Sequence, residues 1–205
     1  MTRIKICGIT NSDDAQLACD MGADAIGLVF YPPSPRCVSI EQALQVVNNL
    51  PPFITTVALF VNAQREDIVQ IIELVAIDLL QFHGDETEAF CASFNRPYIK
   101  AVRMKDGLDL YAVQEEYASA RGLLLDTYKK GIPGGTGETF NWHKIPHNLK
   151  LPVVLAGGLS VQNVSAAITQ VTPYGVDVSG GVEASKGKKD PQKVIQFMQQ
   201  VQQSC

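Results

Sequence analysis

Short apolar runs rich in β-branched residues recur along the whole chain and alternate with amphipathic stretches. Each of the eight runs is almost continuously apolar, which is typical of strands that are buried on both faces in a parallel sheet. The predicted strands cover residues 4–7, 25–30, 55–61, 79–83, 98–103, 122–126, 153–157 and 175–179.

The segments between these runs carry helical signals. Residues 68–75 and 194–201 each place apolar side chains on one helical stripe. Ser39 with Gln42 three residues later predicts a capping box, and Asp85 with Glu88 resembles one. Pro191 stands where it suits the first turn of the final helix, because its missing N–H has no partner to lose there.

Eight strand–helix units in one domain are typical of a closed barrel or of a long doubly wound sheet. A doubly wound nucleotide-binding protein would carry Gly-x-Gly-x-x-Gly after its first strand, and residues 7–10 do not. No Pro/Gly/Ser-rich linker divides the chain. We therefore predict an α/β fold, a single compact (β/α)8 TIM barrel over residues 1–205 with a closed parallel eight-stranded sheet and no fused second catalytic domain.

Composition narrows the class of protein. With 46% apolar and 19% charged residues the chain is not intrinsically disordered. The net charge is −4, and the basic cluster at residues 186–189 is too short for a nucleic-acid track, so we expect no nucleic-acid partner. Five cysteines without a Cys-x-x-Cys pair argue against disulfides and a metal site. No signal-peptide pattern or membrane-length apolar run is present, so we expect a cytoplasmic protein without a membrane partner.

Polar, titratable and glycine residues follow the predicted strands at their carboxyl ends. In a (β/α)8 barrel these ends meet at one mouth, where the active site lies. In strand order the residues are Cys7, Tyr31, Asn62, His83, Arg103, Asp126, Gly157 with Gly158, and Ser179 with Gly180.

The last two strands end in glycines, Gly157 and Gly158 on one and Gly180 and Gly181 after Ser179 on the other. Glycines expose backbone N–H groups, which bind phosphate without a cation, and barrels commonly hold phosphate after strands 7 and 8. The alternative is that these glycines only permit tight turns. Two such pairs at equivalent positions favour a phosphate site.

Cys7 and Asp126 are the candidate proton-transfer groups. Asp126 ends a wholly apolar strand, where partial desolvation suits a general acid, although it could instead be a helix N-cap. Cys7 could be a reactive thiol or a packing residue. As a base it would need a positive neighbour, and Lys5, which we expect on the other side of the strand, is a poor candidate.

Three further features have both a functional and a structural interpretation. The glycine-rich segment 127–137 is either a mobile cover of the mouth or a tolerated loop. Arg36, on a proline-stiffened loop, suits a carboxylate or a second phosphate, or is a surface arginine. His83 is either a catalytic group or a packed histidine.

Six motifs in this order resemble those of phosphoribosylanthranilate isomerase, and the resemblance runs from residue 3 to about residue 190. The motifs are Lys-Ile-Cys-Gly-Ile-Thr at 5–10, Gln-Phe-His-Gly at 81–84, Leu-Leu-Asp-Thr at 124–127, Gly-Gly-Thr-Gly at 134–137, Leu-Ala-Gly-Gly-Leu at 155–159, and Asp-Val-Ser followed by Gly-Val-Glu within 177–183.

The resemblance implies an Amadori rearrangement in tryptophan biosynthesis that uses no cofactor or metal. The small-molecule phosphosugar N-(5-phosphoribosyl)anthranilate would become 1-(2-carboxyphenylamino)-1-deoxyribulose 5-phosphate. Asp126 would be the general acid that protonates the ribose ring oxygen. Cys7 would be the general base that removes the C2 proton from the Schiff base. We expect a monomer or a weak homodimer.

The resemblance also assigns binding residues. Arg36 matches the position that pairs with the anthranilate carboxylate, Asp177 matches one that contacts the sugar, and His83 is placed with the substrate-binding residues. The phosphate cup would contain Gly157, Gly158, Ser179, Gly180 and Gly181.

Two positions depart from the family pattern, in which a serine is usual at 180 and a proline is common at 186. Gly180 keeps the backbone N–H, so phosphate binding should weaken at most modestly. Two alternatives stay open. One is the related sugar isomerase of histidine biosynthesis, which uses an aspartate as base. The other is a non-catalytic barrel that binds a phosphate ligand.

Overall fold

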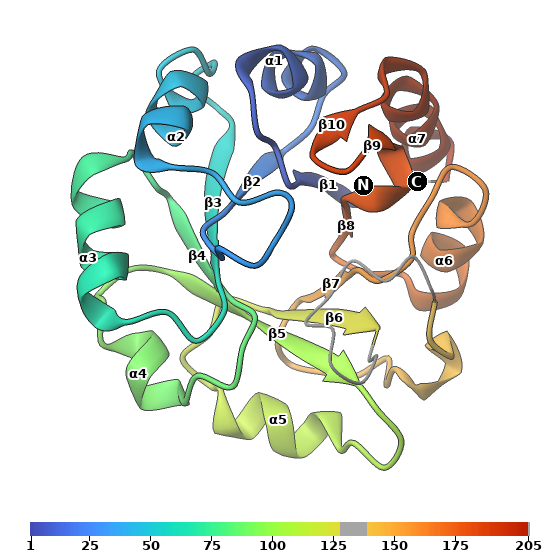
Figure 1. The fold of residues 1–205 in the computed structure, drawn as a ribbon. Helices are drawn as coiled ribbons and strands as arrows, with labels where there is room; N and C mark the ends of the chain where they lie inside the picture. The colour runs from blue at the N-terminus through green and yellow to red at the C-terminus, as the bar shows by residue number, and fades with distance from the viewer. Residues whose placement is uncertain (128–138, 205) are drawn as a thin grey trace.

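The computed structural model describes residues 1–127 and 139–204, and eight parallel strands in it form a closed barrel (Figure 1). Each strand pairs with the next in sequence, and β8 returns to pair with β1. The strands are β1 (Arg3–Cys7), β2 (Ala25–Val29), β3 (Thr55–Phe60), β4 (Leu79–Phe82), β5 (Tyr98–Met104), β6 (Leu123–Thr127), β7 (Val153–Leu155) and β8 (Gly175–Val178). The predicted α/β barrel is confirmed, with strand ends within a residue or two of those expected.

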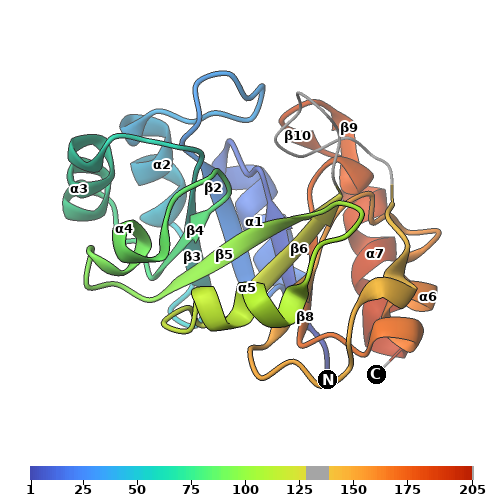
Figure 2. The same ribbon diagram turned by 90° about the horizontal axis from the view of Figure 1, so that it is seen from below.

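Helices surround the barrel on its outside, as Figures 1 and 2 show. They are α1 (Ser12–Asp20), α2 (Ile40–Val47), α3 (Arg65–Leu74), α4 (Glu88–Ala92), α5 (Leu110–Glu116), α6 (Val164–Val171) and α7 (Pro191–Gln203). The described part of the β6–β7 connection holds only the single 3-10 turn η1 (Trp142–Lys144). No helix in the described part of the chain is long and apolar enough to cross a membrane.

The helix starts agree with the sequence signals in two of three cases. Ser39 and Gln42 form the expected reciprocal capping box on α2. Pro191 occupies the first turn of α7. The expectation for Asp85 was wrong, because α4 begins later and its N-cap is Thr87, whose side chain accepts a hydrogen bond from the N–H of Phe90.

Side chains of each strand alternate between two environments. In β1, Ile4 and Ile6 pack in the large apolar layer between strands and helices, whereas Lys5 and Cys7 face the barrel interior. A small apolar cluster of Ile99, Ala101, Leu124 and Ala156 packs separately from the large apolar layer. Polar side chains, among them Gln81, Asp126 and Asp177, line the cavity at the carboxyl ends of the strands.

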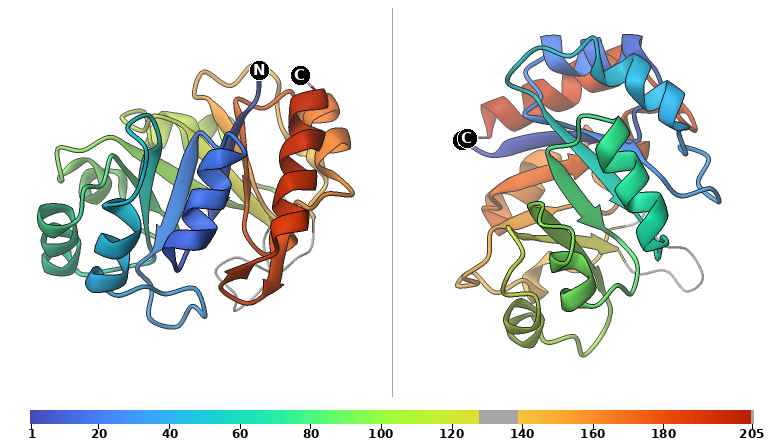
Figure 3. Two further views of the ribbon diagram at one scale, coloured as in Figure 1. Left: turned by 90° about the horizontal axis from the view of Figure 1, so that it is seen from above. Right: turned by 90° about the vertical axis from the view of Figure 1, so that its left-hand side faces the viewer.

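Between β8 and α7 the chain forms a small hairpin at the carboxyl ends of β1 and β8. It consists of η2 (Gly180–Val182), β9 (Glu183–Ser185) and β10 (Lys188–Lys189). Figure 2 and the left view of Figure 3 place this hairpin at the end of the barrel opposite to both chain termini. Helix α7 then runs back beside α1 and α6. The predicted glycine-rich cover falls almost wholly on residues 128–138, outside the described residues.

Candidate active site

A cavity of about 580 Å³ opens at the carboxyl ends of the strands. Every residue assigned to the site from the sequence lines it, although the residues come from strand ends and loops far apart in the chain. These residues are Cys7, Arg36, His83, Asp126, Gly157, Gly158, Asp177, Ser179, Gly180 and Gly181. The closed barrel brings them together because all parallel strands end at the same rim.

Cys7 is the last residue of β1 and is buried beside Val29 and Leu59. Burial raises the pKa of its thiol above the usual value of about 9, because a thiolate loses hydration there. The Lys5 ammonium opposes this shift and stabilises the thiolate. Cys7 therefore lies at the cavity wall, near the Lys5 ammonium, and not in the apolar layer between strands and helices.

The structure corrects the expectation for Lys5. Residues two apart in a strand point to the same face, so Lys5 shares the barrel interior with Cys7. Its Nζ donates to Asp177 Oδ1 of β8 at 2.9 Å, and both side chains are buried. Burial disfavours the ammonium, but Asp177 and Cys7 outweigh it, so the pKa of Lys5 lies above its usual value. Lys5 thus remains a cation inside the barrel.

Asp126 faces the cavity from β6 and is held by two hydrogen bonds. Its Oδ2 lies 3.0 Å from His83 Nε2, and its Oδ1 accepts from the N–H of Thr127 at 2.7 Å. The side-chain amide of Gln81 lies 2.9 Å from His83 Nδ1 and donates to it, which places the histidine proton on Nε2, toward Asp126. Asp126 is the N-cap of no helix in the described part of the chain.

Arg36 is anchored through an ion pair with Glu183 of β9. Its Nε and Nη2 donate to the two carboxylate oxygens at 2.7 and 2.8 Å, a bidentate geometry that fixes the guanidinium plane. Burial raises the pKa of Glu183, but Arg36 and Lys189 outweigh it, so its pKa lies below the usual value. Glu183 does not use the donors on Arg36 Nη1.

Lys189 connects three parts of the site. Its buried Nζ donates to Cys7 O at 2.6 Å, to Ser179 O at 3.3 Å and to Glu183 Oε1 at 3.2 Å. One ammonium therefore joins the end of β1, the loop after β8 and the carboxylate that holds Arg36. Sequence analysis missed this contact, because Lys189 comes ten residues after Ser179 and folds back through the hairpin.

The two glycine loops approach each other closely. Gly157 and Gly158 have positive φ of 79° and 64°, which favours glycine. A side chain on Gly181 would collide with the backbone of Leu159, so the loops after β7 and β8 are in contact. Ser179 Oγ is buried without a hydrogen-bond partner among the described residues. Backbone geometry explains Gly157 and Gly158, and the close approach of Leu159 explains Gly181, but neither explains the unpaired hydroxyl at the cavity wall.

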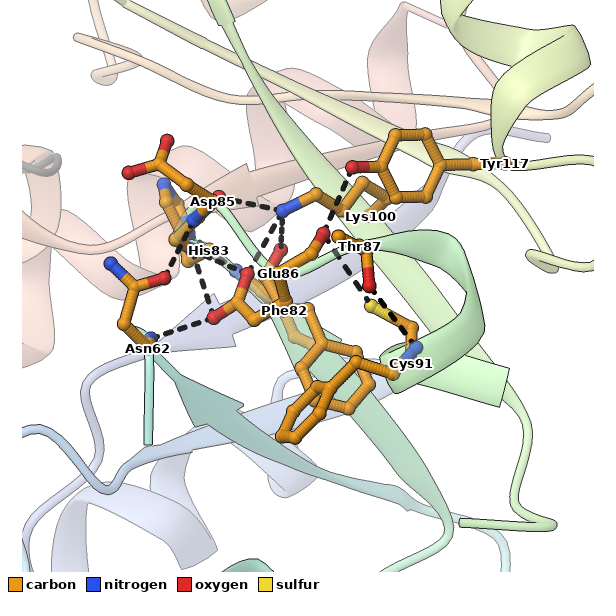
Figure 4. A network of polar contacts seen from close by, with 12 residues as sticks. Asn62, Phe82, His83, Asp85, Glu86, Thr87, Cys91, Lys100 and Tyr117 are labelled. Atoms are coloured by element: carbon orange, nitrogen blue, oxygen red, sulfur yellow. Dashed lines mark hydrogen bonds and ion pairs between the residues drawn. The ribbon is translucent and has the colours of Figure 1, made fainter. Parts of the chain in front are cut away.

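A buried network supports the strand end that carries His83 (Figure 4). Glu86 Oε2 pairs with Lys100 Nζ at 2.9 Å, and the Glu86 carboxylate accepts the N–H groups of Gly84 and Asn62. Lys100 also donates to Gly84 O at 2.6 Å, and Tyr117 donates to Glu86 O at 2.9 Å. Together these contacts fix the backbone on either side of the loop after β4.

Comparisons with known proteins give the family. The family model described as N-(5'phosphoribosyl)anthranilate (PRA) isomerase matches residues 4–200. An N-(5'-phosphoribosyl)anthranilate isomerase from Pseudomonas syringae pv. syringae is 59% identical over 97% of both chains. The phosphoribosyl anthranilate isomerase structure from Thermotoga maritima has a TM-score of 0.91 at 39% identity, covering 99% of this chain and 100% of that one.

A second solved structure is a phosphoribosyl anthranilate isomerase in complex with reduced 1-(o-carboxyphenylamino)-1-deoxyribulose 5-phosphate. It has a TM-score of 0.87 at 38% identity and covers 99% of this chain and 100% of that chain. The match in fold, in sequence and over nearly the full length of both chains leads to one conclusion: the chain belongs to the N-(5'-phosphoribosyl)anthranilate isomerase family.

Proposed function

We propose that this isomerase converts N-(5'-phosphoribosyl)anthranilate into 1-(2-carboxyphenylamino)-1-deoxyribulose 5-phosphate in tryptophan biosynthesis, with Asp126 as general acid and Cys7 as general base. The observation that carries the proposal is that both side chains face one cavity whose rim holds two glycine loops and an anchored arginine. The relative solved with a reduced form of this product supports the choice of substrate.

The cavity offers a place for each end of the substrate. The phosphate would lie against the backbone N–H groups of the loops after β7 and β8, with Ser179 Oγ as a further donor. The anthranilate carboxylate would bind the guanidinium of Arg36 through the donors on Nη1. The ribose then spans the space between Asp126 and Cys7.

The first step opens the ribose ring. Asp126 gives its proton to the ring oxygen, the bond from C1 to that oxygen breaks, and the nitrogen lone pair forms the C=N bond of a cationic Schiff base. The resulting carboxylate is stabilised by the donors His83 Nε2–H and Thr127 N–H. His83 acts here as a positioning residue for the acid, which agrees with its contact to Asp126.

The second step is proton abstraction at C2. The Schiff-base cation makes this proton acidic, so a thiolate at Cys7 can remove it and leave a neutral enolamine. The enolamine then becomes the ketone: C1 takes a proton from a general acid or from water, and the C2 hydroxyl gives its proton to a base or to water as the C2=O bond forms. Each step conserves protons, and no oxidant or external cofactor enters the balance.

The proposal is tested with purified protein and phosphoribosylanthranilate, by following the loss of the fluorescence of the substrate. We expect turnover far above the uncatalysed rate. Equal progress with and without protein would reject the isomerase and favour a non-catalytic phosphate-binding barrel. A parallel assay with the aminoaldose substrate of histidine biosynthesis tests the related isomerase, and turnover of that substrate alone would replace the present proposal.

A further inference from the structure

We propose that Lys5 is the counter-ion of the Cys7 thiolate and that Asp177 holds it in place, a role that deepens the proposed function by naming what makes the thiol a usable base. In this scheme Lys5 contacts no atom of the substrate. It is a positioning residue that acts through Cys7.

Geometry brings the two groups together on the inner wall of the barrel. Lys5 and Cys7 point inward from β1, and Cys7 is paired in register with Gly27 of β2. A Cβ on Gly27 would lie 2.8 Å from Cys7 Sγ and 3.0 Å from Lys5 Nζ. The missing side chain of Gly27 therefore leaves one small space that is shared by the thiol and the ammonium.

The partners of Lys5 keep it charged and immobile. Its Nζ donates to Asp177 Oδ1 at 2.9 Å, and only 7% of its side chain is exposed. An ammonium carries three donors, and this carboxylate takes one of them. A buried charge is tolerated when it is paired, so Asp177 stabilises the Lys5 cation. The remaining two N–H donors of Lys5 can still interact with the thiolate.

The cations around Cys7 favour a thiolate, whereas the carboxylate of Asp177 and burial disfavour it. The charged groups that act on it in the described chain are Lys5 from β1, Asp177 from β8, Lys189 from β10 and Arg36 after β2. Glu183 pairs with the last two. Three cations thus face two carboxylates, and a thiolate would bring this group of charges to neutrality.

Lys5 fits this role better than the other two cations. Lys189 Nζ donates to two backbone carbonyls, those of Cys7 and Ser179, and to the Glu183 carboxylate, so it contacts the backbone of Cys7. Arg36 is fixed on Glu183 through two hydrogen bonds. Among the described residues, Lys5 Nζ has one carboxylate partner, Asp177, and its effect on the thiol is the largest of the three cations.

The test is the pKa of Cys7, measured as the pH dependence of its alkylation by iodoacetamide. Digestion on the amino side of aspartate cleaves between Cys7 and Cys19, so peptide-resolved mass spectrometry then separates Cys7 from the other four cysteines. An opposite charge within 4–6 Å lowers a pKa by about 1–3 units, so we expect Lys5→Met to raise the thiol pKa by about one unit or more. Lys5→Arg should restore most of the lost reactivity because it restores the charge.

Two further variants exclude indirect effects. Lys5→Gln keeps a donor for Asp177 without the charge and serves if Lys5→Met does not fold, and it should show the same upward shift. Lys100→Met removes another buried, carboxylate-paired lysine that does not act on Cys7, so it should leave the thiol pKa unchanged. A folded Lys5→Gln protein with an unaltered thiol pKa would overturn the proposal.

The same titration separates this inference from the proposed function. A shifted thiol pKa in a protein that does not turn over phosphoribosylanthranilate would leave Lys5 as counter-ion and remove the isomerase. Turnover by the wild-type protein with no shift in Lys5→Met and Lys5→Gln would remove the counter-ion alone. With both intact, the activity lost in Lys5→Met should recover in part at higher pH, because more of the thiol is then ionised.

Discussion

His83 Nε2 lies 3.0 Å from Asp126 Oδ2, and both side chains are buried at the wall of the cavity. Gln81 fixes the proton of His83 on the side of Asp126, and the Glu86–Lys100 network fixes the backbone around it. Asp126, the proposed general acid, is thus the end of a chain of contacts that begins behind the cavity wall. Cys7, the proposed general base, is also surrounded by such contacts: Lys189 donates to its carbonyl oxygen, and Lys5 shares the space around its thiol.

The first prediction concerns the two proton-transfer groups. Cys7→Ser and Asp126→Asn should each lower kcat by about 10²–10⁴-fold, because each removes one proton-transfer group and leaves the shape of the site. Steady-state kinetics with phosphoribosylanthranilate measure the loss, and circular dichroism checks the fold. Near-normal turnover by Cys7→Ala would show that another group is the base.

His83 should act on turnover more than on binding. In His83→Leu the Asp126 carboxylate loses a hydrogen bond that is worth about 1.5–3 kcal/mol to a charged group, so kcat should fall about 10- to 150-fold while KM changes little. Gln81→Leu should lower kcat less, in the same direction. His147→Leu, at an exposed histidine, is the matched control, and an equal effect there would remove the assigned role.

Glu183 should matter for binding the carboxylate end of the substrate. Glu183→Gln keeps the shape of the side chain but loosens Arg36, so KM should rise about tenfold with a smaller change in kcat. Arg36→Met should raise KM further, by about 100-fold, because the charge-assisted contact itself is lost. Arg96→Met, at an exposed arginine, is the control and should leave KM unaltered.

The lowered pKa of Glu183 predicts that the stability of the folded protein depends on pH. Its pKa is lowered in the folded protein relative to an ordinary value of about 4.5, so the folded state favours the carboxylate. The resulting stabilisation is full above that value and is lost as the pH falls through the lowered pKa. Urea unfolding should show wild type more stable than Glu183→Gln at neutral pH, with the gap closing in acid. A gap that is constant down to about pH 3 would contradict this.

The Glu86–Lys100 pair should be strongly coupled. Lys100→Met leaves a buried carboxylate without its cation and should cost about 3–5 kcal/mol of unfolding free energy. Adding Glu86→Gln removes that charge while keeping an acceptor for Gly84 and Asn62, so part of the loss should return. In the exposed pair Lys150–Glu115, Lys150→Met should cost less than about 1 kcal/mol. Additive losses in the buried pair would show that the two charges are independent.

The pattern along the chain was enough to predict the barrel and the strand-end residues at its mouth, whereas Asp177 was assigned from the family resemblance, and Gln81 and Glu183, which also line the cavity, were given no role. Continuous apolar runs such as residues 122–126 predict strands covered on both sides, and the polar residue that ends each run marks the rim. Cys7 and Asp126 were found this way, as were the glycines after β7 and β8. Alternation within β1 also carried the information that Lys5 lies beside Cys7, although the sequence analysis placed it on the wrong side.

Other features could not be read from local pattern. The start of α4 at Glu88 depends on Asn62, Glu86 and Lys100, which hold the residues before it in an extended loop. Asp85 consequently remains exposed and caps nothing, although its spacing to Glu88 suited a capping box. Tertiary contacts of the preceding loop outweighed a helix-start signal that is worth about 1 kcal/mol.

What the sequence by itself determined is the order of strands, the parallel barrel and strand-end residues such as Cys7 and Asp126 at its mouth, because these follow from the alternation of strand and helix patterns and from the periods within single elements. What only the tertiary structure decided is how those residues pair. Arg36 meets Glu183, Cys7 O meets Lys189, and Lys5 meets Asp177 through barrel closure and the β9–β10 hairpin. Such partners lie more than a hundred residues apart in the chain, and no local period encodes a contact between them.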